Sequence, residues 1–387
     1  MRIFVLLPRV PYPIEKGDKL RAFHQLRHLS ENHELILCAL SEKKVHPDAY
    51  PELIKFVDNI HFIPIPKAAS AVNIVRAFFS GKPLQVGYYY SEKARRRIDE
   101  LIDFYQPDHI YAQLIRVAEY VKDKKIPKTL DYQDVFSSNM QRRAQAEFFL
   151  LKPLFRFEAS RLRRYERNIF ASFDNKTIIS APDRDLIDHP DKESIEIIPN
   201  GVDTVFFTPK ETEKKYDLVF VGNMNYPPNI DGAEYLVRKI LPIVEKKHGK
   251  IKVLLSGANP HQRVLRLAGE NVEVSGWVDD IRNSYRQARV FIAPMRIGTG
   301  LQNKLLEAMA MKIPCITSTL ANDALEAVDG EEILIGESDE GYADNIISLL
   351  SDDLLYGSIS ENGYRFVNEN FDWYQATTKL EKLMLKK

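Results

Sequence analysis

Short apolar runs alternate with longer amphipathic stretches along the chain, and this alternation occurs in two successive series. A parallel strand buried on both faces is apolar throughout, and two such strands are joined by a long crossover that is usually a helix. The pattern therefore predicts two doubly wound α/β sheets. Strands of the first series are expected at residues 3–7, 34–39, 61–65, 109–112, 128–131 and 175–180. Strands of the second are expected at 217–221, 252–256, 272–275, 290–293, 314–317 and 332–335.

A Pro-Asn-Gly-Val-Asp segment at residues 199–203 has turn chemistry and separates the two series. A chain of 387 residues is also too long for one ordinary hydrophobic core. We therefore expect two Rossmann-like domains, residues 1–198 and 199–370. Apolar positions at helical spacing predict helices at 18–31, 231–245, 281–288, 303–311 and 342–351.

The composition narrows the classes of function. Lysine plus arginine and aspartate plus glutamate each number 54, so no overall field favours nucleic acid, and any anion site must be local. No apolar run approaches the roughly 20 residues that cross a bilayer. Cys38 and Cys315 lie in apolar runs and are expected to be core residues in a reducing compartment, which predicts a cytoplasmic protein. Neither Gly-x-Gly-x-x-Gly after the first strand nor Gly-x4-Gly-Lys-Ser/Thr occurs, so a standard dehydrogenase or P-loop NTPase is not expected.

The segment 293–310 carries the strongest chemical signal, because a glycine-rich loop joins a predicted strand to a predicted helix. Gly298 and Gly300 allow the backbone to approach a ligand closely. Free N–H groups at the helix start suit a phosphate, and Arg296 and Lys304 can balance the charge of a diphosphate.

Glu307 lies about one helical turn after Lys304, so the two side chains can share a face of the predicted helix. A carboxylate there can accept two hydrogen bonds from a ribose diol, as in dinucleotide sites. The alternative is a surface loop with a helix cap and an ordinary Lys–Glu pair at i,i+3.

The same strand and loop, followed by Leu-Glu-Ala-Met-Ala at 306–310 and then Pro314 and Ile316, resemble the signature of retaining GT-B glycosyltransferases. These form the glycogen-synthase-like superfamily, also called glycosyltransferase group 1 or family 4. In that family two glutamates commonly flank seven residues, and the second, which contacts the donor ribose, is matched by Glu307. Thr299 stands in place of the first, as in a subset of exopolysaccharide sugar transferases with a Gly-Thr-Gly-type loop and a lysine.

The resemblance implies an α/β GT-B fold, in which two doubly wound Rossmann-like domains face a cleft and a C-terminal helix at 371–387 returns to the first domain. Residues 220–229 are similar to the first loop of the family's donor domain, which assigns Gly222 and Asn223 to donor binding. The arginine and lysine that other members often have there are absent, which leaves more of the charge to Arg296 and Lys304.

The segment Ser-Gly-Trp-Val-Asp-Asp at 275–280 resembles the family segment that holds the nucleobase. Backbone groups of Trp277 and Val278 would then contact the base, and Asn303, at the predicted helix start, joins the donor-binding set. The alternative for this segment and for 220–229 is ordinary turn chemistry.

In the first half, Gly17 matches the glycine of a family loop whose helix faces the donor diphosphate. Arg21, one turn later, is expected on the acceptor side, near a phosphate or an acidic acceptor. The alternative is that Asp18 caps the helix and Arg21 is solvated.

The family usually places a His or Asp after a later strand, near the anomeric carbon. Gln133 occupies the position of that His, so Asp134 is the candidate for a base or for a charge that stabilises an oxocarbenium-like transition state. The alternative role for Asp134 is the cap of the next helix. Gln113 and Arg116, after the strand at 109–112, are expected on the acceptor side.

Three further features of the sequence bear on metal binding and membrane contact. Asp183-Arg184-Asp185 spells the Asp-x-Asp of metal-dependent transferases, but the preceding Ser-Ala-Pro predicts a helix start, and no metal is expected. His24 and His28 are expected on a helix surface. The aromatic and arginine-rich stretch 148–170 suits either an anionic membrane surface or an amphipathic helix packed on its own domain.

The resemblance implies a retaining, metal-independent glycosyltransferase of hexosyltransferase type that needs no cofactor. It would move a sugar from a UDP- or GDP-sugar to a saccharide or lipid-linked acceptor in cell-surface polysaccharide synthesis. Its expected place is the cytoplasm, with peripheral contact at the inner face of the plasma membrane as one alternative, and no nucleic acid partner is expected. Two other functions remain open, a catalytically silent sugar-nucleotide-binding subunit and a sugar-nucleotide epimerase of the same fold.

Overall fold

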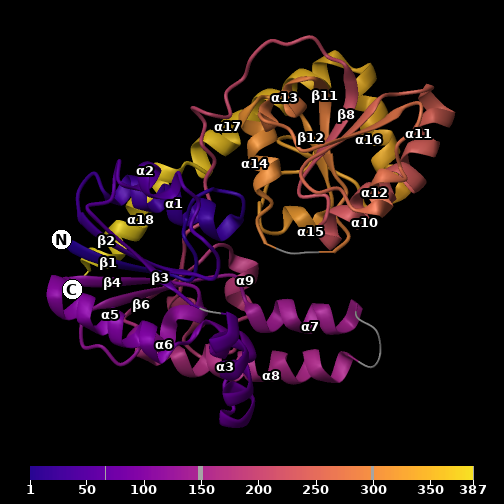
Figure 1. Cartoon of the computed structure of the whole chain (residues 1–387). Helices are drawn as coiled ribbons and strands as arrows, with labels where there is room; N and C mark the ends of the chain where they lie inside the picture. Colours follow the sequence, from indigo (N-terminus) through magenta and orange to yellow (C-terminus); the bar gives the residue numbers. More distant parts are fainter. Residues whose placement is uncertain (66, 147–150, 298–299, 387) are drawn as a thin grey trace. The chain divides into compact units, whose positions relative to one another are not determined.

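The computed structural model describes residues 1–65, 67–146, 151–297 and 300–386. The chain forms two compact units (Figure 1). The first unit contains Met1–Pro199 and Trp373–Lys387, and the second contains Asn200–Asp372.

The first unit is built on a parallel sheet of seven strands in the order β3-β2-β1-β4-β5-β6-β7. Its strands are β1 Arg2–Leu7, β2 Glu34–Ser41, β3 Asn59–Pro64, β4 His109–Gln113, β5 Lys128–Gln133, β6 Asn175–Ile178 and β7 Glu196–Ile197. Its α-helices are α1 Gly17–Leu29, α2 Ala49–Leu53, α3 Lys67–Ser80, α4 Leu84–Tyr89, α5 Glu92–Tyr105, α6 Ala118–Val121, α7 Phe136–Ala146, α8 Lys152–Ile169, α9 Ala181–Asp185 and α18 Trp373–Leu385. Short 3₁₀ turns lie at Ile115–Val117, Phe170–Ser172 and Lys192–Ser194.

The second unit is built on a parallel sheet of six strands in the order β10-β9-β8-β11-β12-β13. Its strands are β8 Tyr216–Val221, β9 Val253–Ser256, β10 Val272–Gly276, β11 Ala288–Ala293, β12 Cys315–Thr317 and β13 Leu334–Ile335. Its α-helices are α10 Pro227–Tyr235, α11 Leu241–His248, α12 Gln262–Leu265, α13 Ile281–Arg286, α14 Asn303–Ala310, α15 Thr319–Asn322, α16 Asp339–Ser351 and α17 Asp353–Asn370. A π-helical turn, Leu236–Ile240, joins α10 to α11 just ahead of Pro242, whose missing N–H interrupts regular α-helical bonding.

The prediction of two doubly wound sheets is confirmed, and each predicted strand is present with its ends shifted by a residue or two at most. The apolar runs are buried on both faces, as in β1, where residues 3–7 are all at most 1% exposed. The sequence pattern missed the two-residue strand β7 and several helices, among them α5 and α17. Cys38 and Cys315 are buried core residues, as predicted.

Helix α18 packs in the first unit. Leu380 and Met384 enter the core beneath α1, and Asn175 Nδ2 donates to the carbonyl of Leu383 at 3.1 Å. His24 of α1 stacks on Trp373, with ring centroids 4.9 Å apart and planes 6° apart. The prediction that His24 lies on a helix surface is therefore wrong, because α18 covers that face of α1. Within the described ranges, no helix has the length and apolarity needed to cross a membrane.

Both sheets reverse their strand order at one point, between β1 and β4 in the first unit and between β8 and β11 in the second. In doubly wound sheets, ligands bind outside the carboxyl ends of the strands at such a switch point. The loops that follow these four strands are therefore the first places to look for a site.

Candidate functional site

Three strand-end loops of the second unit meet backbone to backbone. Gly257 follows β9 with a φ of +143°, and a Cβ on it would lie 1.7 Å from the carbonyl oxygen of Gly222, which follows β8. Gly222 N–H donates to the carbonyl of Ser256 at 3.0 Å, and Gly257 N–H donates to that of Gly276 at 3.1 Å. Only glycine fits at position 257, and the close approach fixes the loop after β8.

Lys304, in the first turn of α14, lies against that loop. Its Nζ donates to Asn229 Oδ1 at 2.5 Å, and Asn229 Nδ2 donates to the carbonyl of Asn223 at 2.9 Å. A Cβ on Gly222 would lie 2.6 Å from Asn229 Nδ2 and 3.2 Å from Lys304 Nζ. The missing side chain at Gly222 therefore makes room for the ammonium group at the switch point between β8 and β11. The structure thus brings together three of the predicted site residues, namely Gly222, Asn223 and Lys304.

Glu307 is held by a residue that the sequence analysis missed. Tyr285, a buried residue of α13, donates its hydroxyl hydrogen to Glu307 Oε2 at 2.7 Å. Burial raises the pKa of Glu307 to about 7, although the Tyr285 hydrogen bond and the charge of Lys304 act against this rise. Burial lowers the pKa of Lys304 to about 7 against the opposing effect of Glu307. Both groups therefore change charge near neutral pH, where a bound anion shifts their balance.

Among the residues described, no side chain caps the start of α14, although the N–H of Leu305 donates to the carbonyl of Gln302 at 2.9 Å. Gln302, at the N-cap, makes no side-chain capping bond, and Asn303 Oδ1 accepts from Asn200 Nδ2 at 3.3 Å. Gly300 has a φ of +80°, which only glycine adopts without strain. Gly298 and Thr299, which the sequence analysis assigned to this loop, lie outside the described residues.

Arg296 was expected to balance the charge of a diphosphate, but in the structure it is paired with a carboxylate. Its Nε and Nη2 donate to the two carboxylate oxygens of Asp231 at 3.0 and 2.7 Å, and its guanidinium lies 4.4 Å from the centre of the Tyr235 ring. Asp231 lies on α10, and this bidentate pair neutralises the charge of Arg296. The physical reason is the position of Asp231, 65 residues earlier in the chain, which spacing within the loop could not reveal.

Trp277 and Val278 lie between β10 and α13, and Asp280 caps α13 by accepting the N–H of Arg282 at 3.0 Å. The Trp277 side chain is 69% exposed. An exposed aromatic ring beside a fixed strand-end loop can contact a planar base.

In the first unit, strained backbone marks the ends of two neighbouring strands. Leu114 after β4 and Gln133 at the end of β5 have φ values of 66° and 63°, and the N–H of Leu114 donates to the carbonyl of Asp131 at 2.7 Å. Positive φ at residues other than glycine is costly and clusters at functional sites. Three buried atoms here have no hydrogen-bond partner within the described ranges, namely Gln113 Nε2, Gln133 Nε2 and Asp134 Oδ1.

Asp134 has an unusual electrostatic setting. Burial raises its pKa to about 7, with further contributions from Asp183 and Asp18, while Arg116 and Arg142 act in the opposite direction. The alternative role as a cap of α7 is not what the structure shows, because Glu166 of α8 takes that place. Glu166 Oε1 accepts the backbone N–H of Ser137 at 3.0 Å, and Oε2 accepts its hydroxyl at 2.5 Å.

Arg116 lies between aromatic rings, with its guanidinium 5.2 Å from the centre of Tyr89 and 4.6 Å from that of Phe136. Its Nη2 donates to Gln85 Oε1 at 3.0 Å. Gly17 begins α1, and an added Cβ there would meet nothing within 4 Å.

Asp18 of the first α1 turn does not cap the helix but accepts Arg9 Nη1 at 2.6 Å. Gln113 and Arg116 are thus grouped by the ends of β4 and β5 with Asp134, whereas Gly17 and Asp18 lie in the first turn of α1.

The prediction for Arg21 on the acceptor side is corrected. The Arg21 side chain is 0% exposed, and its Nε and Nη2 donate to the carboxylate of Asp131 at 2.7 and 3.3 Å. Tyr111 donates to the same carboxylate at 2.8 Å, and Arg21 Nη1 donates to the carbonyl of Pro199 at 3.2 Å. Arg21 therefore ties α1 to the centre of the sheet and does not reach a ligand.

The Asp-x-Asp segment starts a helix, as predicted. Ser180 caps α9 by accepting the N–H of Asp183 at 3.3 Å, and its hydroxyl donates to Asp183 Oδ2 at 2.6 Å. In the described part of the chain, no three His, Cys, Asp or Glu side chains are grouped as metal ligands.

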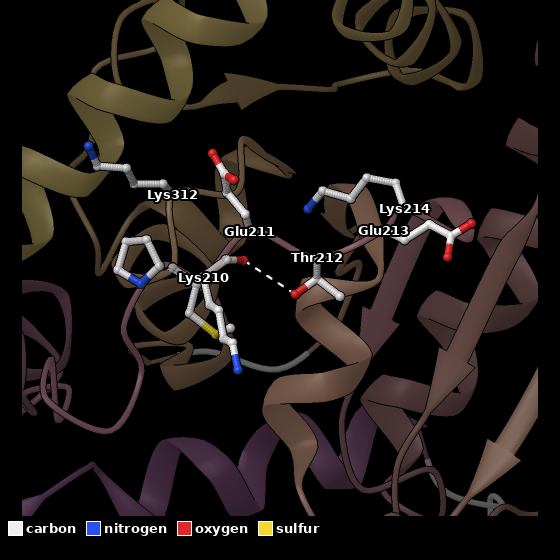
Figure 2. Close-up of a pocket in the computed structure, with 8 residues that line it drawn as sticks. Lys210, Glu211, Thr212, Glu213, Lys214 and Lys312 are labelled. Atoms are coloured by element: carbon white, nitrogen blue, oxygen red, sulfur yellow. Dashed lines mark hydrogen bonds between the residues drawn. The ribbon is translucent and has the colours of Figure 1, made fainter.

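A hollow of about 780 Å³ lies in the second unit beside the loop 209–214 (Figure 2). Figure 2 shows charged side chains that point in different directions, and one contact, in which the Thr212 hydroxyl donates to the carbonyl of Lys210 at 3.4 Å. None of the predicted site residues lines this hollow, and its charged groups do not converge. The switch-point loops, rather than this hollow, form the candidate site.

Known proteins resemble this chain in sequence and in fold. The family model described as "Glycosyl transferases group 1" matches residues 215–352, which span β8 to α16 in the second unit. A protein of Klebsiella pneumoniae, described as an uncharacterized 44.6 kDa protein in the cps region, is 25% identical over 395 residues, which cover 96% of each chain.

Solved structures share the fold over nearly the whole chain. HepE of Anabaena in complex with UDP has a TM-score of 0.73 at 12% identity and covers 99% of both chains. Sucrose-phosphate synthase from Thermosynechococcus elongatus has a TM-score of 0.69 at 15% identity and covers 99% of this chain and 98% of its own. The α/β architecture with two Rossmann-like units is therefore the GT-B fold, and the second unit carries a group 1 glycosyltransferase domain.

Proposed function

We propose that this chain, a GT-B glycosyltransferase, moves a sugar from a nucleoside-diphosphate sugar to a saccharide or lipid-linked acceptor. One observation carries the proposal. An ammonium group and a carboxylate, Lys304 and Glu307, stand one helical turn apart on α14, at the switch point of the sheet in the group 1 domain.

The donor is proposed to bind in the second unit. Its diphosphate would meet Lys304 Nζ and the uncapped N–H groups at the start of α14, two features that both favour an anion. Glu307, oriented by Tyr285, would accept hydrogen bonds from the ribose. Trp277 and Val278 would contact the base. Support comes from HepE, a protein of the same fold that is known in complexes with UDP and with UDP-glucose.

Charge builds on the leaving diphosphate as the glycosidic bond breaks. Preorganised donors at this position lower the barrier, because they are already oriented toward the developing charge. Lys304 is proposed to supply most of this stabilisation, since Arg296 is paired with Asp231. The reaction needs no metal ion in this scheme, and retention of the anomeric configuration is part of the proposal.

The acceptor is proposed to bind in the first unit, beside Asp134. A carboxyl group with a pKa of about 7 is suited to accept a proton from an acceptor hydroxyl at neutral pH, or to stabilise a positively charged transition state. The Nε2 atoms of Gln113 and Gln133, which have no hydrogen-bond partner among the described residues, would donate to acceptor hydroxyls. The name of the Klebsiella pneumoniae relative, which mentions the cps region, favours a role in polysaccharide synthesis. A place on the cytoplasmic side of the membrane is part of the proposal.

A panel of UDP-, GDP- and ADP-sugars tests the proposal by thermal stabilisation of the purified protein. We expect one donor class to raise the melting temperature, and the same donor to release its nucleoside diphosphate when acceptor is added. Stabilisation without turnover would favour a silent binding subunit, and conversion of the donor to an isomer without acceptor would favour an epimerase. Absence of any shift would contradict the donor site.

A further inference from the structure

Another hollow, of about 220 Å³, lies in the first unit. None of the residues assigned to the transfer reaction lines it. It lies where the turn after α3 approaches α6 and α8. Its lining residues are Ser80, Gly81, Lys82, Pro83, Glu119, Lys122, Arg161, Arg164, Tyr165, Asn168, Ile169 and Ser172. Four cationic side chains thus surround one carboxylate.

That carboxylate is already fully engaged. Glu119 is buried and accepts Lys82 Nζ at 2.5 Å, Lys122 Nζ at 3.0 Å and the Tyr165 hydroxyl at 3.0 Å. Burial on its own would raise the pKa of Glu119, but the bonds from the two lysines hold it below its ordinary value. Glu119 therefore remains ionised and cancels one of the four positive charges, so the hollow keeps a net positive charge.

Arg161 is fixed in position, but one of its nitrogen atoms has no hydrogen-bond partner among the described residues. Its guanidinium lies 4.5 Å from the centre of the Phe157 ring and 5.3 Å from that of Phe78, and Nη2 donates to the carbonyl of Phe78. Its Nη1 is buried and has no hydrogen-bond partner among the residues described. A guanidinium held by aromatic rings with an open N–H is a preorganised anion receptor.

An apolar patch borders the hollow. It is formed by exposed side chains of α3 and α8, which are Val72, Val75, Phe78, Phe79, Leu154 and Phe157. The two helices meet in it, because the rings of Phe78 and Phe157 lie 5.9 Å apart, and Figure 1 shows α3 beside α8. Phe79 is 82% exposed, and the lining segment of the hollow begins at the next residue. Contiguous exposed apolar surface with a polar border is typical of a docking site.

The exposed charged side chains of α8 have one sign, and one of them, Arg164, lines the hollow. Helix α8 has two acidic residues, Glu158 and Glu166, and both are buried. Its exposed charged residues are therefore all basic, namely Arg156, Arg163, Arg164 and Arg167, and Arg76 of α3 is also exposed. Because the chain as a whole has a formal net charge of zero, this concentration is local. Basic residues beside exposed aromatic and aliphatic side chains match an anionic bilayer surface.

We propose that the α3/α8 face binds an anionic phospholipid membrane. Phe79 and its apolar neighbours enter the boundary between headgroups and acyl chains, while a lipid phosphate occupies the hollow, contacted by Lys82, Lys122, Arg161 and Arg164. This inference deepens the proposed function, because it would hold the enzyme where a lipid-linked acceptor lies. Its observations are nevertheless independent of the donor site, so that the two can fail separately.

Co-sedimentation of the full chain with lipid vesicles tests the proposal. We expect binding to vesicles that contain phosphatidylglycerol, weak binding to vesicles of phosphatidylcholine alone, and loss of binding as salt increases. Phe79→Ser and Arg164→Glu should each reduce the partition coefficient, the second by more than about fivefold, because one basic residue contributes about that factor and its charge is reversed. Equal binding to both kinds of vesicle would overturn the proposal.

Matched controls are available on α5 of the same unit. Phe104 is 78% exposed, and Arg96 is exposed, so Phe104→Ser and Arg96→Glu make the same chemical changes away from the α3/α8 face. Vesicle binding reduced equally by these controls would overturn the assigned face. Thermal stabilisation of the protein by inorganic phosphate, without any vesicle binding, would overturn the proposal of a membrane surface. The hollow would then be a site for a soluble anion. Donor-induced thermal stabilisation should be unchanged in all four variants, which separates this test from that of the donor site.

Discussion

The hydroxyl of Tyr285 donates a hydrogen bond of 2.7 Å to the Glu307 carboxylate, joining α13 to α14 behind the proposed donor site. The phenol is completely buried, so its position is set by the core of the second unit. A carboxylate oriented from behind in this way keeps its geometry before a ligand arrives, which reduces the cost of binding.

Tyr285→Phe should weaken donor binding by about fivefold, since one hydrogen bond of this kind contributes about 1 kcal/mol. Because that bond lowers the pKa of Glu307, its loss should also move the acid limb of donor binding to higher pH. Calorimetric titration with the donor at several pH values measures both effects. An unchanged dissociation constant would show that Tyr285 does not orient Glu307 for binding.

Donor affinity should be greatest near pH 7 and fall on both sides. A diphosphate favours the protonated Lys304, whose pKa in the free protein is about 7, so affinity should decrease above that pH by at most about tenfold per pH unit. A ribose diol favours the ionised Glu307, whose pKa is also about 7, so affinity should decrease below it. Lys304→Met should remove the alkaline limb, and Glu307→Gln the acid limb. If the alkaline limb of the pH profile persists in Lys304→Met and the acid limb persists in Glu307→Gln, both limbs belong to other groups.

Asp134→Asn should lower turnover by about 10²- to 10⁴-fold, the usual contribution of a general base, and leave donor affinity unchanged. In the unaltered protein at saturating donor, kcat/KM for the acceptor should fall as pH drops below about 7, because Asp134 becomes protonated there. The variant should lose this dependence. A variant with full activity and the same pH profile would remove Asp134 from the mechanism.

Arg21→Met should destabilise the protein by about 3–5 kcal/mol, because it leaves the buried carboxylate of Asp131 without its cationic partner. Denaturant unfolding measures this loss. Arg27→Met on the exposed face of the same helix serves as the control and should change stability little. If Arg21→Met is as stable as the control but loses acceptor affinity, Arg21 acts on the acceptor after all.

Gly257→Ala should be strongly destabilising, since its Cβ would lie 1.7 Å from the carbonyl oxygen of Gly222 and φ is +143°. A loss of roughly 3 kcal/mol or more is expected from strain and the displaced loop. Gly269→Ala, where an added Cβ meets nothing within 4 Å, is the matched control. Equal melting temperatures for the two variants would contradict the close approach of the two loops.

The sheets could be predicted from the sequence because burial on both faces leaves a continuous apolar run at each strand, as at β1 and β8. Gly222 and Lys304 could be proposed because a strand-end glycine and a helix-start lysine carry a local signal. The partners of the charged residues could not be predicted from the sequence. Arg21 meets Asp131 across 110 positions and Arg296 meets Asp231 across 65, so local spacing gave no hint that either guanidinium is occupied.

Other site residues had no signal in the sequence. Tyr285 reads as one more apolar residue of an amphipathic helix, although its hydroxyl holds Glu307. Glu166 lies in an arginine-rich stretch, where an acidic residue suggests a surface ion pair, yet it is buried and caps α7. Such roles depend on which helices pack together, and this is set by the tertiary fold rather than by neighbouring residues.

Calorimetric titration of the donor class identified by thermal stabilisation, into the unaltered chain and into Glu307→Ala, tests the central claim most directly. Glu369→Ala is the matched control, an exposed glutamate on α17 of the same unit. We predict saturable binding to the unaltered chain and the control, and at least about tenfold weaker binding to Glu307→Ala, because a carboxylate bonded to a ribose diol contributes more than a neutral hydrogen bond. Equal affinity for all three proteins would contradict the donor site on α14.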